Sequence, residues 1–121
     1  ASFPCQDLSL AGSGAGLAGE RSGVFWPFWN LMLSLKSEGR HPPIIALENV
    51  AGLITSHNGQ DLTNLISSFA AADYRVGALL VDGAYFVPQS RPRLFIVALA
   101  RGVAIPKGIS GRVPNPSWHP Q

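Results

Sequence analysis

The sequence contains one cysteine, and the residues around it favour a thiol that takes part in chemistry. Cys5 lies between Pro4 and Gln6, and a glycine-rich stretch follows. A neighbouring proline restricts the local backbone, and a glycine-rich loop can close over a bound molecule, so the pattern favours an exposed and positioned nucleophile. The alternative is an inert buried cysteine, the commoner role of a lone thiol. A single cysteine also excludes an intrachain disulfide and a metal site built from several cysteines.

A carboxylate lies near the end of the apolar run Ile44–Val50, where Glu48 and Asn49 interrupt the pattern. A charged side chain in such a run is costly unless it has a partner or a function. Ligand sites of open α/β sheets lie at the carboxyl ends of strands. Two interpretations of Glu48 have equal weight at this point: an acid in a functional site, and a structural ion pair with an arginine.

Two arginines two residues apart form the third candidate group, within Gln89-Ser90-Arg91-Pro92-Arg93. In an extended segment their side chains point the same way. Two guanidinium groups on one side can hold a phosphate, a carboxylate or the carbonyl of a base. The alternative is an exposed basic turn, although the intervening proline stiffens the segment and favours a positioned pair.

Residues 1–23 are predicted to form a loop, because glycine at this density gives much backbone freedom and little packing. Three of the glycines have the Gly-x-Gly-x-x-Gly spacing of a dinucleotide-binding turn. That turn needs a strand before it and a helix that opens at its third glycine. Residues 7–11 make a poor strand and the helical pattern starts later, so we reject this motif. The five glycines are Gly12, Gly14, Gly16, Gly19 and Gly23.

The elements that position these groups alternate between helix and strand along the chain. Apolar residues recur at three- and four-residue steps in two segments, which predicts helices over residues 24–37 and 60–73. The continuous apolar run over residues 44–50 predicts a strand buried on both faces of a parallel sheet. Further apolar runs predict strands over residues 76–82 and 94–100.

Asp82 and Gly83 form a turn signal after the second strand. We expect a return strand to start at Ala84, to reach Val87 and to be interrupted at Pro88, and we expect the hairpin to be antiparallel. The alternation predicts an α/β fold with helices on both faces of the sheet. The first helix should return from a strand upstream of the chain, so the sheet is expected to be incomplete at its N-terminal side.

The length of 121 residues is enough for about one domain, and the sequence starts without Met, which suggests a fragment. Residues 105–121 contain four prolines and are predicted to be a linker or arm. No apolar run reaches the roughly 18 residues that a membrane helix needs, and the three histidines are too widely spaced to suggest a metal site.

After Asp82 there are five basic residues and no acid. This asymmetry favours an anionic partner such as nucleic acid, and the alternative is an ordinary solvated surface.

Taken together, Pro4-Cys5-Gln6, Glu48-Asn49-Val50 and Gln89-x-Arg91-x-Arg93 resemble consecutive signature motifs of the cytosine-5 DNA methyltransferase family. The resemblance covers most of residues 1–100. Between the first two motifs, residues 19–25 are similar to a family element with an acidic-Arg-Gly core before a helix, except that a serine precedes the last glycine. Each motif is moderately specific, whereas the set in this order is highly specific.

The resemblance implies a partial catalytic domain over residues 1–104, part of a Rossmann-like class I methyltransferase sheet. Cys5 is then the nucleophile that adds to carbon 6 of cytosine, and Glu48 is the acid near ring nitrogen 3. Arg93, together with Arg91, holds the base carbonyl or a nearby phosphate. The family flips its base out of the helix, and residues 8–22 are expected to close over it. Further contacts to DNA or substrate are implied for Gln6, Ser9, Asn49 and Gln89, with Asn49 bracing the loop that carries the thiol.

The methyl donor of the family is S-adenosylmethionine, and its main site lies in motifs upstream of this chain. The resemblance leaves minor donor contacts here, at Pro4 and Val24. The implied partners are double-stranded DNA and two parts of the same protein, a donor-binding part upstream and a target-recognition domain downstream. No membrane association is implied. The implied location is inside the cell with DNA, in the cytoplasm or nucleoid if the source is bacterial.

Three other interpretations remain open on sequence alone. One is a tRNA cytosine-5 methyltransferase of the same family. Another is a truncated remnant without activity, and a third is a nucleic-acid-binding module without chemistry. For the main interpretation we expect Cys5, Glu48 and Arg93 to surround one pocket about 10 Å across, the width of a base with its hydrogen bonds.

Overall fold

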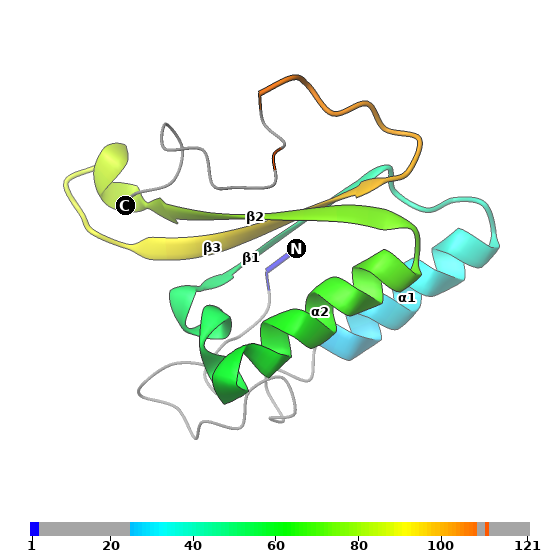
Figure 1. Ribbon diagram of the computed structural model, residues 1–121, viewed down its shortest axis with the longest axis horizontal. Coiled ribbons are helices and arrows are strands. Elements are labelled where there is room, and N and C mark those ends of the chain that lie inside the picture. The colour runs from blue at the N-terminus through cyan, green and yellow to red at the C-terminus, as the bar shows by residue number, and fades with distance from the viewer. Residues whose placement is uncertain (3–24, 109–110, 112–121) are drawn as a thin grey trace.

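The computed structural model describes residues 1–2, 25–108 and 111. Helices and strands alternate through this part of the chain, with short 3-10 turns after the first and second strands (Figure 1). In order, the elements are α1 (Phe25–Ser37), β1 (Ile44–Val50), turns η3 (Ala51–Ile54) and η4 (Ser56–Gly59), α2 (Gln60–Ala71), β2 (Tyr74–Asp82), turn η5 (Gly83–Tyr85) and β3 (Pro92–Ala100).

The last strand in sequence is the middle strand of the sheet, whose order is β1-β3-β2. β3 is antiparallel to both neighbours: Ile44 pairs with Leu99 on one side, and Tyr74 pairs with Ala100 on the other. β1 and β2 are therefore parallel to each other. In consequence the N-terminal end of β3 lies beside the C-terminal ends of β1 and β2.

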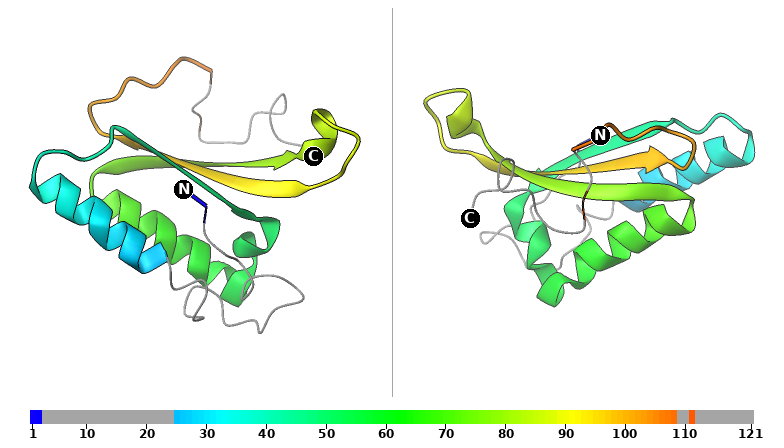
Figure 2. Two further views of the ribbon diagram at one scale, coloured as in Figure 1. Left: turned by 180° about the vertical axis from the view of Figure 1, so that it is seen from behind. Right: turned by 45° about the horizontal axis from the view of Figure 1, so that its top comes forward.

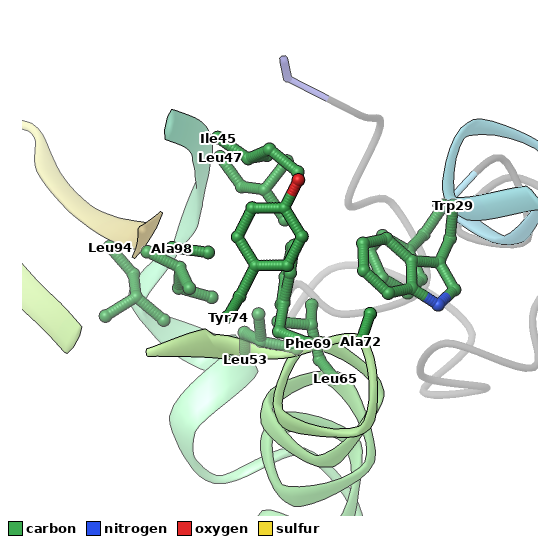
Figure 3. Packing of buried hydrophobic residues seen from close by; sticks show 12 residues of the cluster. Trp29, Ile45, Leu47, Leu53, Leu65, Phe69, Ala72, Tyr74, Leu94 and Ala98 are labelled. Carbon is green, nitrogen blue, oxygen red and sulfur yellow. The ribbon is translucent and has the colours of Figure 1, made fainter. Parts of the chain in front are cut away.

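Both helices pack on the same face of the sheet (Figures 1 and 2). Alternate residues of β1 and β3 are buried beneath them, as period-2 strands require. Aromatic rings join the layers: the centroid of Phe69 in α2 lies 4.6 Å from that of Trp29 in α1 and 6.2 Å from that of Tyr74 in β2 (Figure 3). The buried cluster comprises Phe25, Trp29, Ile45, Leu47, Leu53, Leu65, Phe69, Ala72, Tyr74, Leu94, Ile96 and Ala98.

The segment that follows β3 runs over the opposite face of the sheet (Figures 1 and 2). Arg75 of β2 holds it there by donating a hydrogen bond to the carbonyl oxygen of Val103. Residues 105–108 form neither helix nor strand. Neither described helix is long and apolar enough to cross a membrane.

The α/β class, the three strands, the two helices and the antiparallel hairpin are confirmed. Helices were expected on both faces of the sheet, but α1 and α2 share one face (Figures 1 and 2). The expected burial of residues 44–50 on both faces of a parallel sheet is wrong, because β1 pairs antiparallel with β3 and only its helix-facing residues are buried. The expected return strand from Ala84 to Val87 is wrong. Gly83–Tyr85 form a 3-10 turn, and strand pairing resumes only at Pro92. The expected tight hairpin is therefore a nine-residue connection, residues 83–91, which we call the β2–β3 loop.

Phe69 is fully buried between both helices and the sheet, so its removal should test the packing of all three. We expect Phe69→Ala to lower the free energy of unfolding by about 3–5 kcal/mol, because the lost ring leaves a cavity. Urea unfolding of the protein that contains this chain measures the change. Leu31→Ala, at an exposed position of α1, is the control and should change it by less than about 0.5 kcal/mol. A loss at Phe69 no larger than the loss at Leu31 would contradict this packing.

Candidate active site

A carboxylate and a guanidinium meet where β1 ends and β3 begins. Val50 pairs with Arg93 across the two strands, and Glu48 precedes Val50 by two residues. Residues two apart on a strand share a face with the residues paired opposite them. Glu48 and Arg93 therefore point to the same face, the one opposite the helices. Nε of Arg93 lies 2.9 Å from Oε1 of Glu48, and both side chains are partly buried.

The first two residues of the chain reach this carboxylate from the other side. Ser2 forms a parallel bridge with Glu48, and the backbone N–H of Glu48 donates to the carbonyl oxygen of Ala1 at 3.0 Å. The Ser2 hydroxyl donates to Oε2 of Glu48 at 2.8 Å. Each oxygen of the carboxylate thus has its own donor, Ser2 on one and Arg93 on the other. Sequence reasoning missed Ser2, because nothing in its type or spacing reveals which strand it pairs with.

Asn49 points away from this group, to the face covered by the helices, and is almost fully buried. Its Oδ1 accepts a hydrogen bond from the backbone N–H of Val50 at 2.8 Å. Its Nδ2 is buried without a hydrogen-bond partner among the described residues. Asn49 is therefore not part of the group formed by Glu48 and Arg93, although the two residues are adjacent in the sequence.

The other predicted arginine belongs to the β2–β3 loop, which one carboxylate organises. Oδ1 of Asp82 accepts hydrogen bonds from the backbone N–H groups of Ala84 and Arg91, at 3.0 and 2.6 Å. Oδ2 accepts from the Ser90 hydroxyl at 2.8 Å. Arg91 is held by its backbone while its side chain is exposed, and so is the side chain of Gln89. The Asp-Gly pair could have suggested this arrangement, since Asp side chains often bind the backbone of the turn that follows.

A second polar cluster joins η4 to the start of α2. The Asp61 carboxylate accepts a hydrogen bond from the Ser56 hydroxyl, and Nδ1 of His57 lies 2.9 Å from Oδ2 of Asp61. Serine and histidine both contact the same carboxylate oxygen, so the imidazole does not stand between serine and aspartate as nucleophilic catalysis requires. The cluster holds the turn at His57 and Asn58, whose φ angles of 45° and 56° are left-handed.

The structure thus brings together Glu48 and Arg93, two of the three residues expected to surround one pocket, and leaves Arg91 and Gln89 in the neighbouring loop. The remaining predicted residues lie outside the described residues, and so does the expected closing loop of residues 8–22. Within the described ranges, no group of three or more His, Cys, Asp or Glu side chains could hold a metal ion. The predicted residues outside are Pro4, Cys5, Gln6, Ser9 and Val24.

The order of motifs agrees with a comparison of the sequence with protein families. The model of the C-5 cytosine-specific DNA methylases matches residues 1–119. The chain belongs to this family. The resemblance found in the three motifs is therefore confirmed, and it extends beyond residue 100.

Several bacterial family members are similar to this chain. Type II methyltransferase M.NgoFVII of Neisseria gonorrhoeae is 34% identical over 116 residues, which are 95% of this chain and 29% of that protein. Type II methyltransferase M.BanI of Aneurinibacillus aneurinilyticus is 34% identical over 100 residues, 82% of this chain and 22% of that protein. The chain thus spans less than a third of the length of these two relatives.

A solved methyltransferase structure supports the fold. The crystal structure of S. pombe Dnmt2 methyltransferase superimposes with a TM-score of 0.63 and 21% sequence identity. The match covers 87% of this chain and 31% of that one. The described sheet and its two helices are therefore part of a methyltransferase fold, consistent with the incomplete Rossmann-like sheet expected from the sequence.

The Asp82 carboxyl should titrate below its ordinary pKa of 3.8. The hydrogen bond from the Ala84 N–H contributes most to the lower pKa, followed by those from Ser90 and Arg91. A lowered pKa means that these bonds stabilise the loop at pH values above 3.8, and that this stability is lost as the pH falls through the pKa of the folded protein. An NMR pH titration of the carboxyl carbon measures the shift.

Ser90→Ala is the matched variant, and it should bring the pKa of Asp82 part of the way back toward 3.8 because it removes one of the three donors. A pKa of Asp82 at or above 3.8 in the unmodified protein would contradict the loop structure.

Proposed function

We propose that the protein containing this chain transfers a methyl group to carbon 5 of cytosine in DNA, and that this chain supplies the residues that act on the base. The observation that carries the proposal is the Glu48 carboxylate, held by Ser2 and Arg93 at the C-terminal end of β1. Two residues separate Ser2 from Cys5 in the sequence, and the three Cα-to-Cα steps between them span at most about 11 Å. A thiol and a fixed carboxyl can therefore reach opposite sides of one base.

The proposed chemistry starts from the weak nucleophilicity of carbon 5. The Cys5 thiolate adds to carbon 6 and forms a sulfur–carbon bond, while the electron pair of the carbon 5–carbon 6 double bond moves into the ring. A proton held between Glu48 and ring nitrogen 3 stabilises this charge. Carbon 5 can then accept a methyl group. Loss of the proton on carbon 5 restores the double bond and returns the electron pair of the sulfur–carbon bond to the thiolate.

The other residues position the base and the strand in this proposal. Arg93 fixes the Glu48 carboxylate from one side and has further N–H groups available for the carbonyl of the base. Arg91 binds a phosphate. Asn49, buried beneath Glu48, braces the loop that carries the thiol. The base has to leave the duplex to reach these groups, and the remaining contacts to the nucleic acid come from Gln6, Ser9 and Gln89.

S-adenosylmethionine supplies the methyl group when bound. Its main site is assigned to family motifs that precede this part of the protein. The residues assigned to it in this chain, Pro4 and Val24, lie outside the described residues. In the same proposal residues 1–104 are part of the catalytic domain, and residues 105–121 lead to a target-recognition region. The named relatives are Type II methyltransferases, which supports a modification enzyme that acts on DNA inside the cell.

Two substitutions in the whole protein test the mechanism. We expect Cys5→Ser to abolish methyl transfer and to leave DNA binding largely unchanged, since the thiol acts in the chemical step. We expect Glu48→Gln to lower kcat by about 10²–10⁴-fold, the usual contribution of a positioned acid. Incorporation of labelled methyl groups into phage DNA, which offers many short target sequences, measures both.

A trapping experiment isolates the covalent step. DNA copied with 5-fluorocytosine carries fluorine where the departing proton would be, so the sulfur–carbon bond should persist and the protein–DNA adduct should be visible by mass. Cys5→Ser should give no adduct. Full turnover by Cys5→Ser would refute the mechanism. An unchanged kcat in Glu48→Gln together with lower stability would show that the Glu48–Arg93 pair is purely structural. Methylation of tRNA in place of DNA would refute the proposed substrate.

The isolated 121-residue chain should not methylate DNA measurably. Methyl transfer needs the donor carbon held in line with carbon 5 of the base, and we assign the donor site and the recognition region to other parts of the protein. DNA binding by the isolated chain should be weak and strongly dependent on salt, because it would depend on Arg91, Arg93 and the basic tail. The methyl incorporation assay with this chain alone tests this point, and robust turnover would refute it.

A further inference from the structure

Three consecutive large apolar side chains are exposed at the tip of the β2–β3 loop. Tyr85, Phe86 and Val87 expose 73%, 79% and 52% of their surface. Contiguous exposed apolar groups on a protein surface mark places where another molecule binds. We call these three residues the exposed tip.

Hydrogen bonds at the start and end of the β2–β3 loop hold the exposed tip in place. Beyond the three hydrogen bonds to Asp82, the carbonyl oxygen of Gly83 accepts from the backbone N–H groups of Phe86 and Val87, at 2.8 and 2.9 Å. The loop closes tightly at this glycine: a Cβ on Gly83 would lie 3.2 Å from the carbonyl oxygen of Gln89. A preorganised contact surface binds with less loss of conformational entropy than a mobile one.

The exposed tip also lies at the same end of the sheet as the candidate active site. Arg93 pairs with Val81 on one side and with Val50 on the other, so the loop that follows Asp82 emerges beside the Glu48–Arg93 pair. α1 lies toward the other end of the sheet (Figure 1). The exposed tip is therefore next to the place where a flipped base would sit.

The same loop carries an exposed basic side chain, Arg91, next to the exposed tip. Arg91 is exposed and, within the described residues, makes no ion pair. The carboxylate of Asp82 is occupied by the loop itself. After Asp82 the sequence contains five basic residues and no acid. Aromatic rings beside an exposed arginine are the combination that binds nucleic acid strands, by stacking on bases and by pairing with phosphates.

We propose that the exposed tip and Arg91 form a contact surface for the DNA strand that flanks the flipped cytosine. Tyr85 and Phe86 pack against the bases or sugars next to the vacated position, and Arg91 binds a neighbouring phosphate. Asp82 acts as the positioning residue that keeps this surface in shape. The inference rests on the proposed function, because DNA as the substrate is itself proposed.

The test uses the whole protein and a fluorescent 30-base-pair duplex, with the dissociation constant measured over a series of salt concentrations. Replacing Tyr85 and Phe86 together by alanine should weaken binding about tenfold and leave the slope of log Kd against log salt unchanged, because no charge is lost. Arg91→Ala should reduce that slope by about one, because one phosphate contact is lost. Leu31→Ala, an exposed apolar residue of α1, is the matched control and should change neither quantity.

The outcomes separate this inference from the proposed function. If the unmodified protein methylates DNA and the double variant binds the duplex as tightly as before, the inference is refuted and the function stands. Unchanged binding together with a lower unfolding temperature would show that another part of the protein covers the exposed tip, which also refutes the inference. Phe86→Trp keeps an aromatic ring and should retain affinity, whereas Phe86→Ala should not. An equal loss of affinity for the duplex in Phe86→Trp and Phe86→Ala would refute a role for the aromatic ring.

Discussion

The position of β3 between β1 and β2 determines where Glu48, Arg93 and the β2–β3 loop lie relative to one another. β3 is antiparallel to both neighbours, so its first residues lie beside the last residues of the other two strands. Were it parallel, Arg93 would be at the far end of the sheet from Glu48. The strand reversal thus brings an acid from the end of one strand within 2.9 Å of a guanidinium from the start of another. It also places the β2–β3 loop, which turns the chain back, at this same end.

The Glu48–Arg93 contact is compatible with both interpretations of Glu48 that the sequence left open. A carboxylate in an apolar run was expected to be either a functional acid or a partner of an arginine. The structure shows the partner, and the family membership supports the acid. The two roles are compatible, because a carboxyl that must meet one edge of a base has to be held at a fixed angle. Ser2 and Arg93 hold its two oxygens separately, which fixes the plane of the group as well as its position.

The elements were predictable from local patterns, and their arrangement was not. The apolar run Ile44–Val50 is a strand with the predicted bounds, because its length and apolar composition favour a strand, although only alternate residues of it are buried. Tyr85 to Val87 show the limit of that reasoning, since three apolar residues after a turn signal look like a strand. Here the Asp82 carboxylate accepts from the backbone N–H of Ala84, and the carbonyl oxygen of Gly83 accepts from those of Phe86 and Val87, so these groups form a turn in place of strand pairs. The strand order and the single face occupied by both helices depend on contacts far apart in the sequence, which local patterns do not encode.

The same order of strands has a consequence for how the chain acquires its shape during synthesis. The strand that joins the other two is made last, and the pairs between β1 and β3 link residues 43 to 55 positions apart, from Val50 with Arg93 to Ile44 with Leu99. Pairs between β2 and β3 are closer, 10 to 26 positions apart, and nearby pairings form faster than distant ones. During synthesis, therefore, the backbone groups of β1 that pair with β3 stay unpaired until the hairpin of β2 and β3 has formed. A product that stops short of Pro92 would retain both helices and two strands that have no strand between them, with unpaired edges that invite aggregation.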